Sequence, residues 1–207
     1  MRVCERFMSI QGEGQTIGVP TYFIRAAGCN LRCAWCDTGY AWEGGAEETV
    51  GEIVAAVGDA MDVCLTGGEP MLQEDAPELL RRLVAAGKRV VVETNGSVDI
   101  SGIPKDGRVI VSLDVKCPSS GMSDRNLLSN LEHIGVKDQL KFVIGGQEDL
   151  EYAVRFMGEN PVPASVIFSP VGGTDIRYIA EEVVRRGLPV RVLPQLHKVI
   201  WGDERSV

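Results

Sequence analysis

Short apolar segments rich in β-branched residues alternate along the chain with longer segments of helical period. The apolar segments predict seven strands, and the amphipathic segments between several of them predict four helices. The predicted strands cover residues 21–28, 61–66, 88–94, 108–115, 139–146, 165–170 and 188–194. The predicted helices cover residues 49–58, 74–87, 147–158 and 174–187.

This alternation favours parallel strands joined by right-handed crossovers, in either an open sheet or a barrel. The 207 residues are too few for eight complete strand and helix units. We find no repeat, linker or low-complexity tract that would divide the chain. We therefore expect a single α/β domain over residues 1–207, built as a partial, open-sided (β/α) barrel of about six to seven mostly parallel strands. Its functional loops should follow the carboxyl ends of the strands.

Composition and charge narrow the range of partners. A chain with 44% hydrophobic and 24% charged residues is typical of a folded domain. Its net charge of -8 argues against nonspecific binding of nucleic acid, which requires clustered lysine and arginine. No apolar segment is long enough to span a bilayer, and the first ten residues lack the apolar core of a signal peptide. We expect a cytoplasmic protein that binds neither nucleic acid nor membrane and acts on a small molecule or another protein.

Three of the six cysteines are clustered, and Cys29, Cys33 and Cys36 have the spacing C-x3-C-x2-C. In a reducing cytoplasm such clustering indicates metal binding. Three thiolates on one loop can each bind one iron of a 4Fe-4S cluster, which leaves the fourth iron open to another ligand. A zinc site, or a noncatalytic iron-sulfur protein, would normally supply a fourth ligand, and the only histidines, His133 and His197, are distant in sequence. The pattern favours a catalytic cluster, with those two alternatives left open.

The cysteine loop, with Trp35 before its last cysteine, is similar to the signature of the radical S-adenosylmethionine (SAM) superfamily. The resemblance implies a radical SAM core, in which the open iron binds SAM and an electron from the cluster cleaves it to a hydrogen-abstracting radical. Residues 65–70, LTGGEP, resemble the superfamily motif that meets the amino group of SAM. Its glycines permit close backbone approach and Glu69 can accept a hydrogen bond from an ammonium group. Taken alone, the motif could be a turn.

Polar residues also end two further predicted strands. Because the carboxyl ends of parallel strands share one side of a sheet, we expect Ser97, Ser112, Asp114 and Lys116 to lie near the cofactor. Turn formation is the alternative for Ser97, and a solvated surface charge is the alternative for Lys116. Together with the resemblance, this predicts a SAM site made of Trp35, Cys36, Asp37, Gly67, Gly68, Glu69, Ser97, Ser112, Asp114 and Lys116.

The segment SIQGEG at residues 9–14 resembles the 7-carboxy-7-deazaguanine synthase family. Similar segments follow at residues 18–20, 23–30, 36–38 and 195–202, so the resemblance spans the chain. It implies conversion of 6-carboxy-5,6,7,8-tetrahydropterin to 7-carboxy-7-deazaguanine with loss of ammonia, on the route to queuosine and archaeosine. The alternative within the superfamily is a glycyl-radical-enzyme activating enzyme, which the QGEG and HKVIWG segments argue against.

A flat pterin requires backbone groups and a few fixed side chains in a half-apolar pocket. Arg25 can bind the substrate carboxylate with a planar, bidentate fork, although an ion pair with an acidic residue is the alternative. A packing or capping role is the alternative for His197. The resemblance implies that Glu13, Arg25 and His197 are catalytic and that the substrate is bound by Ile10, Gln11, Gly12, Arg25, Thr66 and His197.

The resemblance also implies that the hydroxyl of Thr38 binds Mg²⁺ together with the substrate. Magnesium prefers hard oxygen ligands and commonly takes only one or two from the protein. From its position alone, Thr38 would be a helix N-cap. The resemblance further implies a homodimer, and cleavage of SAM requires an electron donor that the sequence does not identify.

Overall fold

Every apolar segment predicted to be a strand forms a strand in the computed structural model, which describes residues 1–207. Adjacent members of this set pair in parallel and in sequence order. These strands are β2 (Pro20–Ala26), β4 (Asp62–Gly67), β5 (Arg89–Thr94), β6 (Val109–Val115), β7 (Gln139–Ile144), β8 (Ser165–Pro170) and β9 (Arg191–Val192).

Two antiparallel strands were not predicted. β1 (Arg2–Ile10) pairs with β2 on one side and with β3 (Ala46–Glu47) on the other. The expectation that the first strand begins near residue 21 is therefore wrong. β1 has only one strongly buried position, so it lacks the continuous apolar run of a strand covered on both faces. Its Phe7 stacks on Phe23 of β2, with ring centroids 5.2 Å apart.

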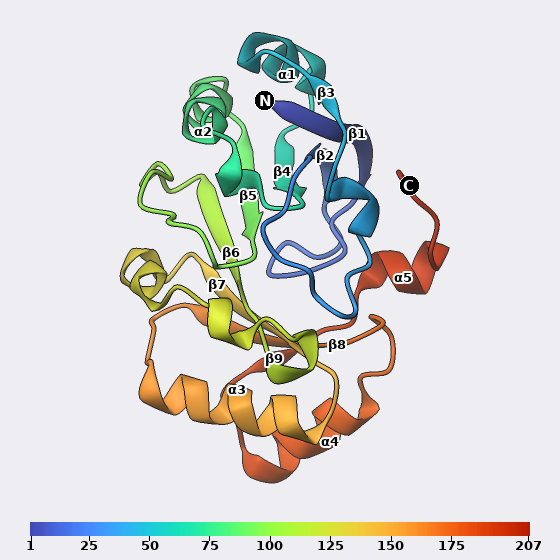
Figure 1. The fold of residues 1–207 in the computed structure, drawn as a ribbon, viewed down its shortest axis with the longest axis vertical. Helices are drawn as coiled ribbons and strands as arrows, with labels where there is room; N and C mark the ends of the chain where they lie inside the picture. The colour runs from blue at the N-terminus through green and yellow to red at the C-terminus, as the bar shows by residue number, and fades with distance from the viewer.

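The complete sheet has the order β3-β1-β2-β4-β5-β6-β7-β8-β9. Because β3 and β9 do not pair with each other, the sheet curves without closing, and the predicted open-sided barrel is confirmed. Two helices cover the outside near β4 and β5, and two others cover the outside near β7, β8 and β9 (Figure 1). The carboxyl ends of the parallel strands are left free on the inner side.

The four predicted helices are present with ends shifted by a few residues: α1 (Val50–Val57), α2 (Ala76–Ala85), α3 (Gln147–Glu159) and α4 (Arg177–Arg186). A capping box begins α1, because the Thr49 side chain accepts from the Glu52 amide while the Glu52 carboxylate accepts from the Thr49 amide. A short fifth helix, α5 (Leu196–Trp201), was not predicted. No helix is both long and apolar enough to cross a bilayer.

The barrel is shortened at two crossovers. No α-helix lies between β5 and β6, and only 3₁₀ turns lie between β6 and β7: η3 (Pro118–Ser120), η4 (Ser123–Arg125) and η5 (Leu128–His133). Two further 3₁₀ turns, η1 (Gly39–Ala41) and η2 (Pro70–Leu72), follow the cysteine loop and β4. The core between sheet and helices includes Phe142, whose ring meets the edges of Phe156 and Phe168 at centroid distances of 5.6 Å.

Candidate active site

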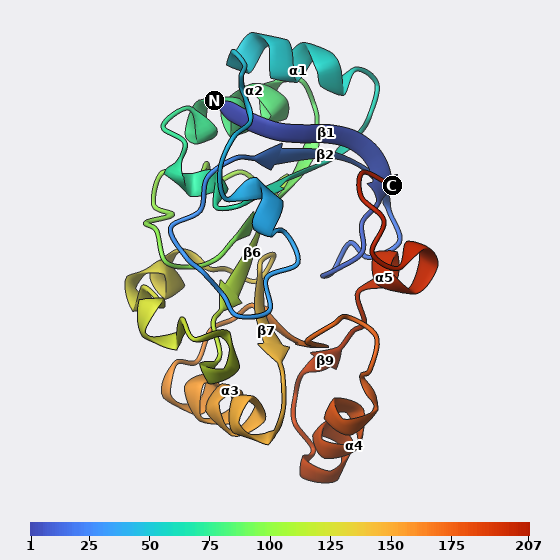
Figure 2. The same cartoon turned by 45° about the vertical axis from the view of Figure 1, so that its right-hand side comes forward.

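The cysteine loop, the ends of the parallel strands and the C-terminal segment surround one cavity of about 490 Å³. This is the size of a small-molecule site. The C-terminal segment returns to lie beside β1, where the Ser9 hydroxyl donates to the Val207 carbonyl oxygen (Figure 2). The predicted site residues that line the cavity are Ile10, Gln11, Gly12, Glu13, Arg25, Cys29, Cys33, Trp35, Cys36, Asp37, Thr38, Thr66, Gly67, Gly68, Asp114, Lys116 and His197.

Cys29, Cys33 and Cys36 are free thiols on one wall of this cavity. The sulfur of Cys29 accepts from the Leu31 amide at 3.4 Å and from Asn95 Nδ2 at 3.7 Å. Burial raises the pKa of Cys33, although Lys116 acts in the opposite direction. Three thiolates on one loop suit a 4Fe-4S cluster, which binds each thiolate at a different iron, whereas a structural zinc site takes four ligands. The donor set fits the cluster.

The paired glycines after β4 pack against the base of the cysteine loop. A methyl group on Gly68 would lie 2.1 Å from the Gly28 carbonyl oxygen, and one on Gly67 would lie 2.3 Å from that of Ala26. Gly67 also has a φ of +146°. The Gly68 amide donates to Ala26, and the Glu69 amide donates to Gly28 at 2.8 Å. The glycines therefore allow close approach to the cysteine loop, in addition to lining the cavity.

Glu69 lies beneath the cavity wall rather than in it. Its side chain is fully buried, and its carboxylate accepts from Thr94 Oγ1 at 2.9 Å and from the amides of Met71 and Asn95 at 2.9 and 2.6 Å. Thr94 and Asn95 themselves line the cavity. In this arrangement Glu69 organises the loops around the predicted SAM site without facing it.

Ser97 and Ser112 are also outside the cavity wall. Both the amide and the hydroxyl of Ser97 donate to Asn95 Oδ1, which is the turn that its sequence context allowed. Its hydroxyl also accepts from Asn30 Nδ2 of the cysteine loop at 2.8 Å. Ser112 is buried in β6 and accepts from Gln139 Nε2 at 2.7 Å. Its side chain serves the pairing of β6 with β7.

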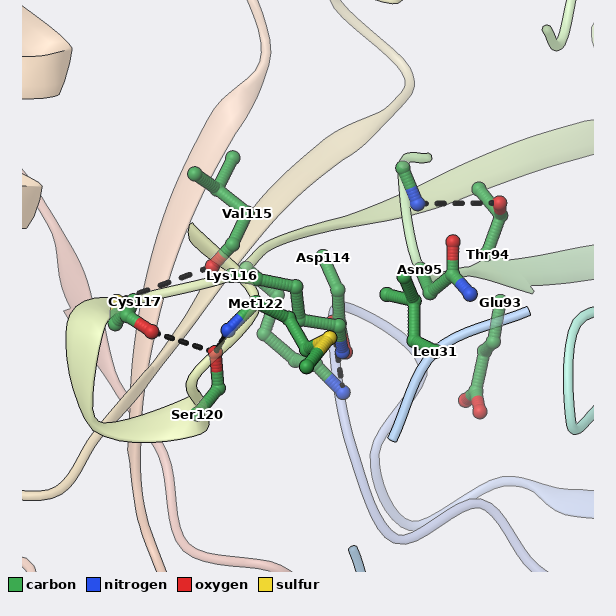
Figure 3. Close-up of polar contacts among 12 residues, drawn as sticks. Leu31, Glu93, Thr94, Asn95, Asp114, Val115, Lys116, Cys117, Ser120 and Met122 are labelled. Atoms are coloured by element: carbon green, nitrogen blue, oxygen red, sulfur yellow. Dashed lines mark hydrogen bonds and ion pairs between the residues drawn. The ribbon is translucent and has the colours of Figure 1, made fainter. Parts of the chain in front are cut away.

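A buried network of charges forms part of the cavity wall, and sequence analysis identified only some of it. Lys116 Nζ lies 2.9 Å from Asp114, and Lys141 Nζ lies 3.1 Å from the same carboxylate while also bonding Glu13. Figure 3 shows Asp114 and Lys116 with Glu93 from the neighbouring strand. Lys116 is buried, so the alternative of a solvated surface charge is wrong. Lys141 was not predicted, although it is a charge inside an otherwise apolar strand. Glu93 belongs to a polar strand end expected to line the site, but no role was assigned to it.

The charged network shifts the pKa values of its three carboxyl groups in different directions. Burial alone would raise the pKa of Glu13 and of Asp114. The positive charge of Lys141 near Glu13, and those of Lys116 and Lys141 near Asp114, more than offset burial, so both pKa values lie below their ordinary values. Burial and repulsion by Glu13 raise the pKa of Glu93. Burial lowers the pKa of Lys141, but Asp114 and Glu13 hold it well above its ordinary value. The cavity wall therefore holds the ion pairs of Lys141 with Glu13 and Asp114 beside Glu93, a carboxyl group that retains its proton more readily.

Two predicted substrate residues, Gln11 just after β1 and Thr66 on β4, both form hydrogen bonds with Glu93 of β5. Its Oε1 accepts from Gln11 Nε2 at 3.3 Å, and its Oε2 accepts from Thr66 Oγ1 at 2.9 Å. The Glu13 amide in turn donates to Gln11 Oε1 at 3.2 Å. The QGEG segment is thus joined to the ends of β4 and β5 by side-chain hydrogen bonds.

Arg25 has the acidic partner that the alternative interpretation required, because its Nε lies 2.6 Å from Glu5 Oε1. It nevertheless lines the cavity. His197 packs its imidazole against Gly12, where an added methyl group would lie 2.1 Å from Nδ1. Burial lowers the pKa of His197, which favours the neutral imidazole near pH 7. Both residues therefore combine packing with access to the cavity.

Thr38 precedes η1, at the N-cap position its sequence context suggested. Its side chain makes no capping hydrogen bond, and its hydroxyl donates instead to Asp37 Oδ1 at 2.8 Å. Both side chains line the cavity. A hydroxyl and a carboxylate at the cavity wall are hard oxygen donors of the kind that magnesium prefers.

The open sheet and the three-cysteine loop together indicate one class of protein, the radical SAM enzymes. Residues 23–158 match the family model for the radical SAM superfamily. The chain belongs to that superfamily. It is 42% identical to the 7-carboxy-7-deazaguanine synthase of Thermoplasma acidophilum over 209 residues, with all of both chains covered. It is 47% identical to that of Methanospirillum hungatei, over 97% of this chain and 85% of the relative. Within the superfamily, the chain belongs to the 7-carboxy-7-deazaguanine synthases.

Solved structures agree with this assignment. QueE from Escherichia coli superposes with a TM-score of 0.75 at 25% identity, over 92% of each chain. SuiB from Streptococcus suis superposes with a TM-score of 0.62 at 17% identity, over 83% of this chain and 47% of that one, which is a likeness of fold. The predicted fold class, family and enzyme class are confirmed.

Proposed function

We propose that this chain converts 6-carboxy-5,6,7,8-tetrahydropterin to 7-carboxy-7-deazaguanine and ammonia. One observation carries the proposal: the cysteine loop, the glycine pair after β4, the QGEG segment and His197 line the same cavity. When bound, the 4Fe-4S cluster and SAM supply the radical that abstracts hydrogen from the substrate. The names of the relatives, whose similarity covers the whole chain, support the same reaction.

The chain's own residues bind and orient the pterin in this proposal. Arg25 pairs with the substrate carboxylate through its guanidinium fork. Glu13 is held ionised by Lys141, so it accepts hydrogen bonds from the N–H groups of the pterin edge. Gln11, Ile10 and Gly12 supply the adjoining edge, and the neutral His197 closes the cavity over the ring. Fixed contacts of this kind hold a reacting ring in one orientation.

SAM is assigned to the wall nearest the cysteines. Trp35 offers an aromatic face and lies with Lys116 Nζ 5.9 Å from its ring centroid, and its Nε1 donates to Ser119 Oγ. The Asp37 and Asp114 side chains provide polar contacts at the same wall, and the absence of side chains at Gly67 and Gly68 leaves room for the cofactor. Three further residues belong to the proposed SAM site although they do not line the cavity. Their hydrogen bonds support the segments that do, and they are Glu69, Ser97 and Ser112.

Magnesium, bound by Thr38 and by the substrate carboxylate, belongs to this proposal. The Thr38 hydroxyl at the cavity wall and the neighbouring Asp37 carboxylate support it. Bound there, the cation would orient the carboxylate together with Arg25 and neutralise its charge.

Three further expectations belong to the proposal. The six cysteines are free thiols, which suits a cytoplasmic location where the cluster is kept in a reducing environment. An external one-electron donor must reduce the cluster, because the reaction begins with reductive cleavage of SAM. A homodimer, and a product that enters queuosine or archaeosine synthesis for tRNA, stay predictions of the resemblance. Light scattering of the purified protein tests the dimer.

The decisive experiment reconstitutes the protein anaerobically with iron and sulfide and adds SAM, Mg²⁺, a reductant and 6-carboxytetrahydropterin. Mass spectrometry then tests for 7-carboxy-7-deazaguanine, which should be absent with a Cys33→Ala variant. Deoxyadenosine without a deazapurine would retain the superfamily and reject the substrate, and would turn attention to a protein substrate as in glycyl-radical activation. Absence of both from cluster-loaded protein would favour a noncatalytic iron-sulfur protein.

A further inference from the structure

Glu5 and Arg25 face each other across the β1–β2 pair. They are direct partners in the antiparallel register, so their side chains leave the sheet on the same face. Arg25 Nε lies 2.6 Å from Glu5 Oε1, and both side chains are 16% exposed. Arg25 reaches the cavity wall, whereas Glu5 does not line the cavity. Glu5 therefore lies behind Arg25, where it contacts the arginine without lining the cavity.

The Glu5 carboxylate accepts two further hydrogen bonds, both from other residues of the protein. Oε1 also accepts from the Tyr40 hydroxyl at 2.9 Å, and Oε2 accepts from the Ser206 hydroxyl at 2.8 Å. The Arg205 guanidinium lies over the Tyr40 ring, 4.0 Å from its centroid. Glu5 thus joins four segments: β1, β2, the turn after the cysteine loop and the C-terminal segment.

The Arg25 side chain makes its one hydrogen bond through Nε, so neither terminal nitrogen of the guanidinium donates to another group of the chain. Those two nitrogens form the end of the fork that binds a carboxylate in parallel. A carboxylate at Nε fixes the plane of the guanidinium and restricts the rotamers of a long, flexible side chain. The geometry points to a support that aims the fork into the cavity.

We propose that Glu5 is a positioning residue, which holds Arg25 so that its terminal nitrogens receive the carboxylate of the substrate. The inference rests on the proposed function for the identity of that substrate. Glu5 contributes to substrate selection by this route, because a ligand lacking the carboxylate gains nothing from an oriented Arg25. The charged hydrogen bonds of Glu5 also lower its pKa despite burial, so the support is ionised at neutral pH.

The test measures binding of two ligands to the cluster-loaded protein with SAM and Mg²⁺ by anaerobic calorimetry. One ligand is 6-carboxytetrahydropterin and the other is tetrahydropterin without the carboxylate. Glu5→Ala should weaken binding of the carboxylated ligand by about tenfold, the effect of losing one charge-assisted hydrogen bond, and leave the other ligand unchanged. Glu5→Gln keeps an acceptor for Arg25 Nε and should recover most of the affinity. Glu78→Ala, which removes the partner of Arg82 at 2.5 Å on α2, is the matched control.

Thermal unfolding of each variant shows whether the fold is retained. If Glu5→Ala does not fold, Glu5→Asp carries the test, because its shorter side chain loses the 2.6 Å contact with Arg25 Nε and should weaken binding of the carboxylated ligand alone. Equal weakening of both ligands by Glu5→Ala, or no weakening of either, would overturn the proposal. So would a Glu5→Gln variant that binds the carboxylated ligand as poorly as Glu5→Ala. Turnover by the wild-type protein reports separately on the proposed function, because a protein that binds the carboxylated pterin without forming a deazapurine still yields the binding comparison.

Discussion

Gly12 and His197 meet at the cavity from opposite ends of the chain. The Gly12 carbonyl oxygen accepts from the Leu196 amide at 2.8 Å, and the imidazole of His197 fills the space where a side chain on residue 12 would project. The short α5 is anchored to the QGEG segment by this contact. The absence of a side chain at residue 12 therefore positions a residue near the end of the chain.

Gly12→Ala should reduce kcat/KM by at least about tenfold, because the added methyl group would lie 2.1 Å from His197 Nδ1 and must displace it. The unfolding midpoint should fall by only about 2–4 °C, since α5 can shift at a cost near 1 kcal/mol. Steady-state kinetics and calorimetry measure both. Gly51→Ala in α1 meets nothing closer than 3.9 Å and should leave kinetics unchanged while adding roughly 0.5 kcal/mol of stability. Unchanged kinetics in Gly12→Ala would contradict the assignment of His197 to the substrate site.

Arg25→Ala should lower kcat/KM for the carboxylated pterin by about 10- to 150-fold, the effect of losing 1.5–3 kcal/mol from a charged hydrogen-bonded pair. Slow cleavage of SAM without substrate should persist, because Arg25 contacts none of the three cysteines. Arg25→Lys should not restore activity, since an ammonium group lacks the planar fork. Product and deoxyadenosine are quantified together, and full turnover by Arg25→Ala would contradict its assignment.

Cys33→Ala should lose most of its bound iron and sulfide after reconstitution, because two thiolates cannot hold a cluster that needs three. The circular dichroism spectrum should not change, since Cys33 is half-buried on a loop. Cys64→Ala is the matched control: Cys64 is buried in β4, and its loss should cost stability while leaving iron content intact. Metal analysis decides the matter, and normal iron content in Cys33→Ala would reject this cluster site.

Glu93→Gln should stabilise the protein at pH 8 and lose that advantage as pH falls. The pKa of Glu93 is raised in the folded state by burial and by Glu13, so its ionisation costs stability increasingly as pH rises from the unfolded-state pKa to the raised folded-state pKa, and in full above it. Below the unfolded value, about 4.3, the carboxyl is protonated in both states and the variant gains nothing. Urea denaturation between pH 8 and pH 4 measures the difference. If Glu93→Gln is instead less stable than the wild type at pH 8, the attraction between Lys141 and ionised Glu93 is stronger than the combined effect of burial and repulsion by Glu13.

Thr38→Ala should raise the Mg²⁺ concentration required for half-maximal turnover by about tenfold, because one hard oxygen ligand is lost. Thr38→Ser keeps the hydroxyl and should retain the wild-type requirement. Cluster content and SAM cleavage without substrate should be normal in both variants. Titration of activity with Mg²⁺ measures the effect, and an unaltered titration for Thr38→Ala would assign the hydroxyl only to its hydrogen bond with Asp37.

The cysteine loop shows what local sequence could establish. Its spacing alone limits the site to three thiolates on one loop, and the polar residues after apolar strands marked the side of the sheet on which the cavity lies. Arg25 shows the limit of such reasoning. Binding of a substrate carboxylate and an ion pair were weighed as alternatives, but the structure shows that they are compatible, because Nε contacts Glu5 while the residue still lines the cavity.

Residues in the charged network could not be grouped from sequence. Lys141 and Glu93 lie on strands far apart in the chain. Lys141 is tolerated in the interior because Asp114 and Glu13 lie within contact distance, whereas the Glu93 carboxylate accepts hydrogen bonds from Gln11 and Thr66. β1 was missed for a related reason. Its polar residues are paired across the sheet or face the cavity, so its pattern lacks a continuous apolar run.

The sequence by itself determined the seven parallel strands, the four longer helices and the spacing of the three clustered cysteines, because hydrophobic period, turn residues and cysteine spacing act over short stretches of chain. Only the tertiary structure decided which charges pair, which predicted residues stand behind the cavity wall and which segment closes it. Glu69 illustrates the difference: its three hydrogen bonds are made to neighbours on two loops, and they turn it away from the cavity. Contacts of that kind depend on distances that exist only after the chain has folded.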